Sequence, residues 1–267
     1  MTPQTLFLAW QDPASRQWYT VGRLDVDAPA GGDGAATAAR FIFAYTGGAS
    51  AAAEKAGFSP VVSFPDLGRT YASDTMPPLF ANRIMPRRRP EFADLLAWLG
   101  LDGASADDLA VLARSGGRRA TDSFEVYPCP SRSPDGLYRA HFFLRGLRYQ
   151  PMAAQERALQ LAPGERLRLI ADLQNPTDPR ALAVRTDGAE PGDTYFLGFL
   201  PRYLADDLQH VLAAGQDAVR VSAVRANGPP APEHFRVLCL VEAQWPDGHE
   251  PFHGAAYQPL ARPALAR

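Results

Sequence analysis

The sequence has little of several features that mark specialised proteins. Only Cys129 and Cys239 are cysteines among 267 residues, and they are 110 positions apart, so neither a disulfide framework nor a cysteine metal site is expected. No apolar run approaches the ~18 residues that a membrane-spanning helix needs. A basic leader is also missing before Leu6, and we therefore expect a cytoplasmic protein.

Lysine is almost absent: Lys55 is the only lysine among 27 basic residues. The excess of Arg, Ala, Gly and Pro is typical of a GC-rich bacterial genome. The net charge is −2, and between residues 138 and 246 twelve arginines are balanced by twelve acidic residues. No overall basic field would drive nonspecific binding to nucleic acid, so any such contact must be local.

Length and composition predict two small folded domains. The hydrophobic fraction of 46% is that of a globular protein, and the chain is long enough for two domains of roughly 100 to 150 residues. A segment rich in Pro and Ser, residues 129–137, is interpreted as a linker between a first domain at 1–128 and a second at 138–246. A tail without a readable pattern follows at 247–267. The predicted fold class is α+β.

The first domain is predicted to contain a small sheet and two helices. Apolar residues at i, i+3, i+4 and i+7 from Phe92 predict a helix over residues 91–99 that ends at Gly100. A stretch rich in Ala and Gly, residues 28–39, is interpreted as disordered. The other predicted elements are strands at 6–10, 17–24 and 40–45, the first two forming a hairpin, and a helix at 107–113.

The second domain is predicted to be a mostly β, OB-like, partly closed barrel with one main helix. The helix begins near Pro201, has an apolar face that includes Leu204 and Leu208, and ends at Gly215. Small barrels of this kind commonly present a concave face and loops to single-stranded nucleic acid, although a fold alone does not establish a function. The predicted strands are 138–149, 166–174, 181–185, 194–199, 218–226 and 235–243.

Three motifs of the second domain occur in the order that a known family shows. They are Gly146-Leu147-Arg148-Tyr149, the segment Leu173 to Val184 with its Asn175-Pro176-Thr177-Asp178 turn, and Leu197-Gly198-Phe199-Leu200-Pro201-Arg202 before the helix. With this order, residues 141–243 resemble the HIRAN family. The resemblance implies capture of the 3′ end of single-stranded DNA.

The resemblance also implies roles by matching position. Arg148 and Tyr149 would lie beside the terminal bases, Asn175 and Asp178 would face the terminal sugar, Arg202 would reach a phosphate, and Phe199 belongs to the same set. A Tyr ring stacks on any base for about 1 to 3 kcal/mol, and Arg binds phosphate oxygens through its planar fork. Asp178 would accept a hydrogen bond from a free 3′-hydroxyl and repel a phosphate, which selects strand ends.

A structural interpretation of the same residues stays open. Asn175 and Asp178 could only cap an Asx-type turn between strands, and Arg148 could be a solvated strand residue. Thr177 departs from the family pattern, because members that bind DNA can carry an aromatic residue there as a second stacking surface.

The first domain resembles the N-terminal subdomain of HipA-type kinase toxins. After Gly117 the sequence supplies no kinase catalytic set, so the resemblance implies a docking or regulatory module for a kinase-like partner. Phe80, Asn82 and Arg83 are candidates for that docking surface, although a core position is favoured for Phe80. The resemblance is carried by Val21–Leu24, Phe41–Tyr45, Ser59–Leu67, Pro78–Pro86 and Gly116–Gly117.

No motif predicts an enzyme or a cofactor. The sequence has no Gly-x-Ser-x-Gly elbow, and His249 and His253 flank Pro251 in a segment that is expected to be a solvated loop rather than a metal site. Arg87-Arg88-Arg89 is interpreted as an exposed loop and Gly116-Gly117 as a turn. The leading hypothesis is a non-enzymatic protein that binds single-stranded DNA ends. The alternative is an interaction protein of a toxin–antitoxin or defence system that partners a HipA-like kinase and does not bind DNA.

Overall fold

The computed structural model describes residues 4–27, 39–101, 106–188, 192–213 and 219–261. The chain forms two compact units. The first contains residues 1–92, 105–129 and 252–267, and the second contains residues 93–104 and 130–251. The stretch predicted to be disordered lies outside the described residues except for Ala39, and so does Gly215, the predicted end of the helix after Pro201.

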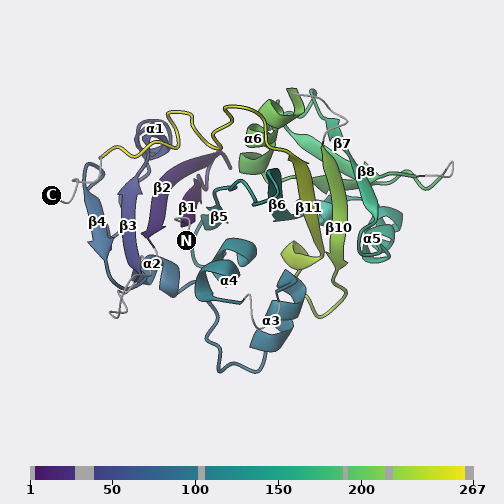
Figure 1. Ribbon diagram of the computed structural model, residues 1–267, viewed down its shortest axis with the longest axis horizontal. Helices are drawn as coiled ribbons and strands as arrows, with labels where there is room; N and C mark the ends of the chain where they lie inside the picture. The colour runs from purple at the N-terminus through teal and green to yellow at the C-terminus, as the bar shows by residue number, and fades with distance from the viewer. Residues whose placement is uncertain (1–3, 28–38, 102–105, 189–191, 214–218, 262–267) are drawn as a thin grey trace. The chain divides into compact units, whose positions relative to one another are not determined.

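The first unit is built on a five-stranded antiparallel sheet (Figure 1). Its strands follow the order β4-β3-β2-β1-β5. The three strands expected from the sequence are confirmed: β1 is longer at both ends, β2 extends further toward its C-terminal end, and β3 has the expected bounds. Strands form here because these segments are rich in aromatic and β-branched residues. Leu6, Phe7 and Leu8 are consecutive and all buried, so both faces of the sheet are covered at β1. The strand bounds are β1 Gln4–Gln11, β2 Trp18–Asp27, β3 Arg40–Tyr45, β4 Thr70–Ser73 and β5 Phe124–Pro128.

Helix ends in this region follow from local capping chemistry. The Asp107 carboxylate accepts the Ala110 N–H at 2.6 Å and begins α4 at Asp108, while Gly116 ends it with a φ of 73°. The paired glycines 116 and 117 are thus a helix-terminating turn, as the sequence indicates. The bounds are α1 Gly47–Ala56, α2 Pro78–Ala81 and α4 Asp108–Ser115. Helix α3, Phe92–Leu99, was expected in the first domain, but all of it after Phe92 belongs to the second unit.

Aromatic side chains dominate the core of the first unit. The rings of Phe43 and Phe64 stack at 4.1 Å, and Phe80 is fully buried against them. Tyr45 is also buried, where its hydroxyl donates to the Phe64 carbonyl and accepts the Val61 N–H, and burial raises the pKa of Tyr45 to about 12.

Two residues proposed for a docking surface are therefore part of the interior. Phe80 is a core residue, which its apolar character explains. The Arg83 side chain is only 2% exposed, because its guanidinium binds the Asp122 carboxylate at 2.7 Å and the Gly117 carbonyl at 2.9 Å. The prediction that Arg83 lies at the surface was wrong. Its partner Asp122 is 39 positions away, so no local sequence pattern reveals the ion pair that buries it. Asn82 is exposed.

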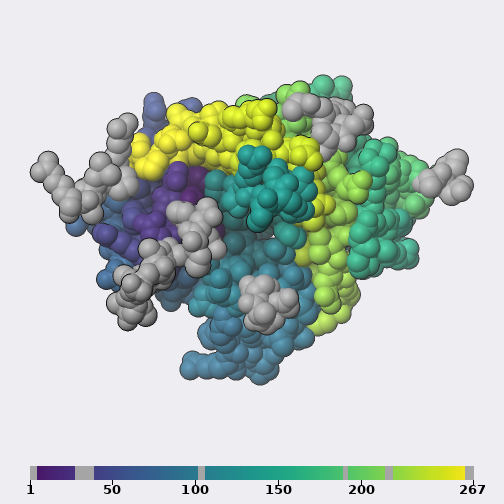
Figure 2. Space-filling model, viewed as in Figure 1, coloured from purple at the N-terminus to yellow at the C-terminus, as the bar shows by residue number. Residues whose placement is uncertain are grey.

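The last described residues pack on the first unit instead of forming a patternless tail. The Phe252 and Tyr257 rings lie 5.4 and 5.6 Å from the Phe7 ring. Gly47 donates to the Gln258 carbonyl at 2.9 Å, and a Cβ at Gly47 would lie 2.2 Å from a backbone oxygen of this segment, so only glycine fits. Figure 2 shows the yellow C-terminal residues beside the purple and blue N-terminal ones.

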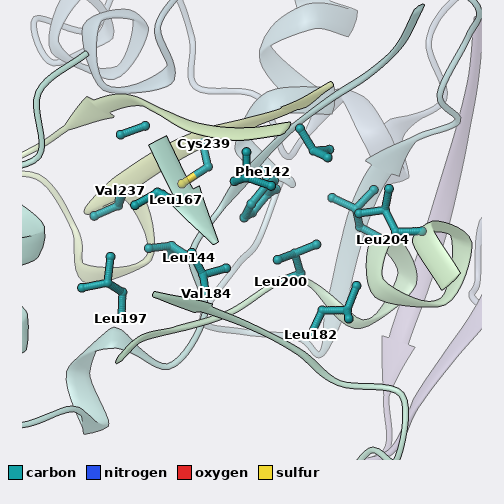
Figure 3. Close-up of a cluster of buried hydrophobic side chains, with 14 of the residues drawn as sticks. Phe142, Leu144, Leu167, Leu182, Val184, Leu197, Leu200, Leu204, Val237 and Cys239 are labelled. Carbon is teal, nitrogen blue, oxygen red and sulfur yellow. The ribbon is translucent and has the colours of Figure 1, made fainter. Parts of the chain in front are cut away.

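The second unit holds a six-stranded antiparallel sheet that curls into a half-barrel (Figure 1). Its strand order is β6-β11-β10-β7-β8-β9. Figure 3 shows the core of buried side chains that this curvature encloses, including Leu167 of β7 and Leu204. The strand bounds are β6 Leu137–Phe143, β7 Arg166–Ala171, β8 Leu182–Thr186, β9 Phe196–Phe199, β10 Arg220–Ala226 and β11 Val237–Gln244.

Helical segments of the second unit differ from the prediction. Helix α6, Arg202–Ala213, is the predicted main helix, but a second helix, α5 at Met152–Leu159, was missed. Helix α5 buries only Ala154 and Ala158, so its sequence lacks the large apolar stripe that marks a helix. The predicted strand 138–149 ends early, at Phe143, and is followed by a short 3-10 helix, η1 at Leu147–Tyr149.

Two further polar residues of this unit are buried. His249 was predicted in a solvated loop, yet its side chain is 4% exposed, with Nε2 3.6 Å from Asp207, and its ring lies 5.4 Å from the Trp245 ring. Asn227 donates to the carbonyls of Trp98 and Phe235 at 3.0 and 2.6 Å, which ties α3 to the 3-10 helix η3, Glu233–Phe235. Among the described residues, none of the helices has the length and apolar character that a membrane span requires.

Candidate nucleic-acid interface

The first group of candidate residues is aromatic and lies where η1 meets β9. Gly146 has a φ of 77° and turns the chain into η1, where the Tyr149 N–H donates to the Gly146 carbonyl at 3.0 Å. Arg145 and Phe199 exchange two backbone hydrogen bonds of 2.9 Å. A Cβ at Gly146 would lie 3.7 Å from the Phe199 ring and 4.0 Å from the Tyr149 ring, so these two rings flank one glycine.

Tyr149 is a large aromatic residue in an unusual position, because it is 74% exposed. The Arg148 guanidinium lies 4.6 Å from the centre of its ring, donates to its hydroxyl and is 3.6 Å from the Glu233 carboxylate. The guanidinium and the ring form a cation–π pair. The hydrogen bond to the Tyr149 hydroxyl, together with the nearby Glu233 carboxylate, raises the pKa of Arg148. Arg148 is therefore in a helical turn and not in a strand.

The second group is polar and forms the turn between β7 and β8. The Asn175 side-chain oxygen accepts the N–H groups of Thr177 and Asp178 at 3.0 Å, and its amide donates to Asp172 at 3.0 Å. Both polar atoms of Asn175 thus serve the turn, which fits the Asx-turn interpretation for this residue. Asn175 therefore stabilises the turn that positions Asp178.

Asp178 connects this turn to the beginning of α6. One carboxylate oxygen accepts the Arg180 N–H at 3.0 Å, and the other lies 3.5 Å from the Arg202 guanidinium. Asp178 is nearly buried, whereas Arg202 is about one-third exposed. Asp178 and Arg202, which belong to separate sequence motifs, therefore form one ion pair.

A neighbouring carboxylate was not identified from the sequence. Asp206 lies 3.1 Å from the Arg180 guanidinium and is largely buried, and burial raises its pKa. Arg180 and Arg202 act against that shift, while Asp178 and Asp207 reinforce it. The polar group is thus a set of alternating charges at the first turns of α6.

The six candidate residues form two groups that one short segment joins. Arg148, Tyr149 and Phe199 make the aromatic group, and Asn175, Asp178 and Arg202 make the polar group. Phe199 and Arg202 are three residues apart, so their Cα atoms are at most about 11 Å from each other. An aromatic surface and a charged pair at this separation suit a ligand that offers a flat ring and an anionic, hydroxyl-bearing sugar phosphate.

Comparison with known families identifies this region. Residues 137–246 match the HIRAN domain model. The match supports a HIRAN domain at these residues, the HIRAN region, and it leaves the resemblance of the first unit to HipA-type proteins a prediction. HIRAN is a family of DNA-binding domains, so the match supports nucleic-acid binding by the HIRAN region.

Two solved structures are similar to part of the chain. The crystal structure of the HIRAN domain of human HLTF is 21% identical, with a TM-score of 0.27, over 40% of this chain and 74% of that chain. A protein from Lactobacillus plantarum is 15% identical, with a TM-score of 0.29, over 39% of this chain and 98% of that chain. No curated protein matches the chain.

Proposed function

We propose that the HIRAN region binds single-stranded DNA and holds its 3′ end, without catalysing a reaction. The observation that carries the proposal is the exposed Tyr149 ring, which lies beside Phe199 and within one short segment of the Asp178–Arg202 pair. An exposed ring on a rigid turn loses little conformational entropy when a base stacks on it. The terminal base would stack on this ring, exchanging with or stacking opposite the Arg148 guanidinium.

Selection of an end would come from Asp178. A carboxylate accepts hydrogen bonds and donates none, so it pairs with a 3′-hydroxyl and repels a 3′-phosphate. Arg202, which already lies next to Asp178, would bind the phosphate on the 5′ side of the terminal sugar. Asn175 would fix the turn that aims Asp178.

Fluorescence anisotropy with 5′-labelled oligonucleotides at one fixed salt concentration tests the proposal. The wild-type protein should bind a strand with a 3′-hydroxyl with micromolar or tighter affinity and should bind the matching 3′-phosphate strand more weakly. In Asp178→Asn, which keeps an acceptor oxygen but removes the charge, the discrimination against the 3′-phosphate should shrink. Equal weak binding of both strands by the wild-type protein would reject end capture.

For the first unit we propose docking to a kinase-like protein partner. One described feature favours a protein contact: Val62 is 98% exposed, and it lies in the Ser59–Leu67 segment that carries the HipA resemblance. Co-purification with a kinase-like product of a neighbouring gene, in the absence of DNA, tests this docking. Val62→Asp should abolish that co-purification, and retention of the partner by this variant would argue against docking through the segment.

A further inference from the structure

Strand β9 contains an extra residue that changes which side chains share a face. Phe199 is paired with Ala183 of β8, Gly198 with Val184 and Phe196 with Arg185, so the register shifts between Val184 and Arg185. In a regular strand, residues three apart point to opposite faces. The extra residue, Leu197, points into the core instead, and the Phe196 and Phe199 rings meet on the outer face at 5.2 Å and 76°.

The result is a row of three aromatic rings on the outer surface of the HIRAN region. Phe196 is 37% exposed and touches Phe199 edge to face, while Phe199 and Tyr149 flank Gly146. Gly198 keeps the row together, because a Cβ at that position would lie 2.3 Å from the Arg145 carbonyl oxygen and would push η1 away from β9. Phe196 therefore continues the aromatic group away from Tyr149.

Beside Phe196 the sheet carries arginines that face one another. Arg185 is paired directly with Phe196 on one side and with Arg168 of β7 on the other. Like charges directly opposite each other on neighbouring strands are destabilising. Asp187 lies 2.5 Å from Arg168 and 3.7 Å from Arg166, whereas within the part of the chain that the structure describes no carboxylate pairs with Arg185.

We propose that Phe196 is a second base-stacking subsite, for the base next to the terminal one, and that Arg185 binds a phosphate beyond it. The inference rests on the proposed function of the HIRAN region and extends it. An unpaired nucleic-acid strand fits because it alternates flat apolar bases with anionic phosphates, which is the chemistry of an exposed ring beside an uncompensated guanidinium. Phe196 would supply the second stacking surface that Thr177 does not.

An abasic series tests the subsite. The affinities of wild type and Phe196→Ala are measured with 3′-hydroxyl oligonucleotides that are intact, abasic at the last nucleotide or abasic at the second-last nucleotide. Phe196→Ala should weaken binding of the intact strand about 5- to 150-fold, and the same loss should largely vanish when the second-last base is already missing. An equal loss with every strand, or no loss with any, would overturn the subsite.

The failure of the subsite and the failure of the proposed function give different results. If wild type binds none of the strands, the function proposed for the HIRAN region fails. If wild type prefers 3′-hydroxyl ends but neither Phe196→Ala nor the second-last abasic site changes affinity, only the subsite fails. Leu260→Ala, which truncates an apolar residue of similar exposure in the first unit, is the matched control and should bind every strand as wild type does.

Arg185 has its own measurement. Arg185→Gln should reduce the slope of log affinity against log salt concentration by about 0.7, the value expected for one fewer phosphate contact on a single strand. An unchanged slope would remove Arg185 from the inference. Sedimentation velocity of wild type and Phe196→Ala gives a further outcome: a dimer that this substitution dissociates would assign the aromatic row to a second copy of the chain and overturn the nucleic-acid subsite.

Discussion

Both units are antiparallel sheets with buried aromatic residues, yet the aromatic residues that are exposed among the described residues, Tyr149 and Phe196, lie in the HIRAN region. In the first unit Phe43, Tyr45 and Phe80 are buried, and the Arg83 guanidinium is enclosed with its Asp122 partner. In the HIRAN region Tyr149 and Phe196 are exposed, and Arg185 faces another arginine. Exposed aromatic rings forgo hydrophobic stabilisation, which fits the ligand-binding surface proposed for the HIRAN region.

The largest effect that this comparison predicts is on the stability of the first unit. Phe80→Ala removes a fully buried ring and should lower the free energy of unfolding by about 3 to 5 kcal/mol, because a cavity is left among the neighbouring rings. Urea denaturation followed by tryptophan fluorescence measures the loss. Unchanged stability together with loss of a protein partner would instead indicate that Phe80 belongs to a docking surface.

The opposite pattern is expected for Tyr149→Ala. Loss of the stacking surface should weaken binding of a 3′-hydroxyl strand by about 1 to 3 kcal/mol. The free energy of unfolding should change by less than about 0.5 kcal/mol, because the ring is exposed in the unbound protein. Anisotropy and urea denaturation on the same sample separate the two quantities. A folded variant that binds as tightly as wild type would remove Tyr149 from the interface.

Asp206 provides a test of charge burial in the HIRAN region, because this partly buried carboxyl group lies next to the candidate interface. Burial raises the pKa of Asp206 above its ordinary value of 3.8, so ionisation of this carboxyl opposes folding. Its contribution to stability is full below pH 3.8 and is lost as the pH rises through the raised pKa. The free energy of unfolding of Asp206→Asn, minus that of wild type, should therefore increase over this range.

Measurement of that difference by urea denaturation between pH 3.5 and 7 cancels the carboxyl groups that both proteins share. Asp178, Asp207, Arg180 and Arg202 surround the group and remain in the variant. A difference that falls with rising pH would mean that pairing with Arg180 outweighs the cost of burial.

The smallest effect is expected at Val62. Val62→Ser alters a side chain that is 98% exposed in the first unit, so the free energy of unfolding should stay within about 0.5 kcal/mol of wild type. Oligonucleotide affinity should also be unchanged, since the residue lies outside the HIRAN region. A clear loss of stability would show that Val62 contributes to the core of the first unit.

Much of the fold could be predicted from the sequence because strands with alternating burial, such as β3 and β11, leave a period-two pattern. Helix α5 was missed because it buries alanines only, and η1 was missed because a single glycine at 146 turns the chain. The burial of His249 depends on Asp207 and Trp245, and no local pattern reveals such a partnership.

The candidate site was predictable in part for a different reason. Motif order named the turn with Asp178 and the segment with Arg202, and the structure brings these two side chains within 3.5 Å. Phe196 could not be found by strand periodicity, since its spacing from Phe199 assigns it to the other face unless the extra residue in β9 is known. Gly198 is the signal in the sequence, because an isolated glycine inside a strand often marks such an irregularity.

The return of the chain to the first unit after residue 251 makes the HIRAN region an insert rather than a terminal appendage. The residues that follow it complete the core of the first unit. A protein shortened to end at residue 246, the predicted end of the second domain, would therefore lose part of the core of its first unit. Excision of residues 130–251 alone would in turn leave residues 93–104, which belong to the second unit, without the residues that they contact.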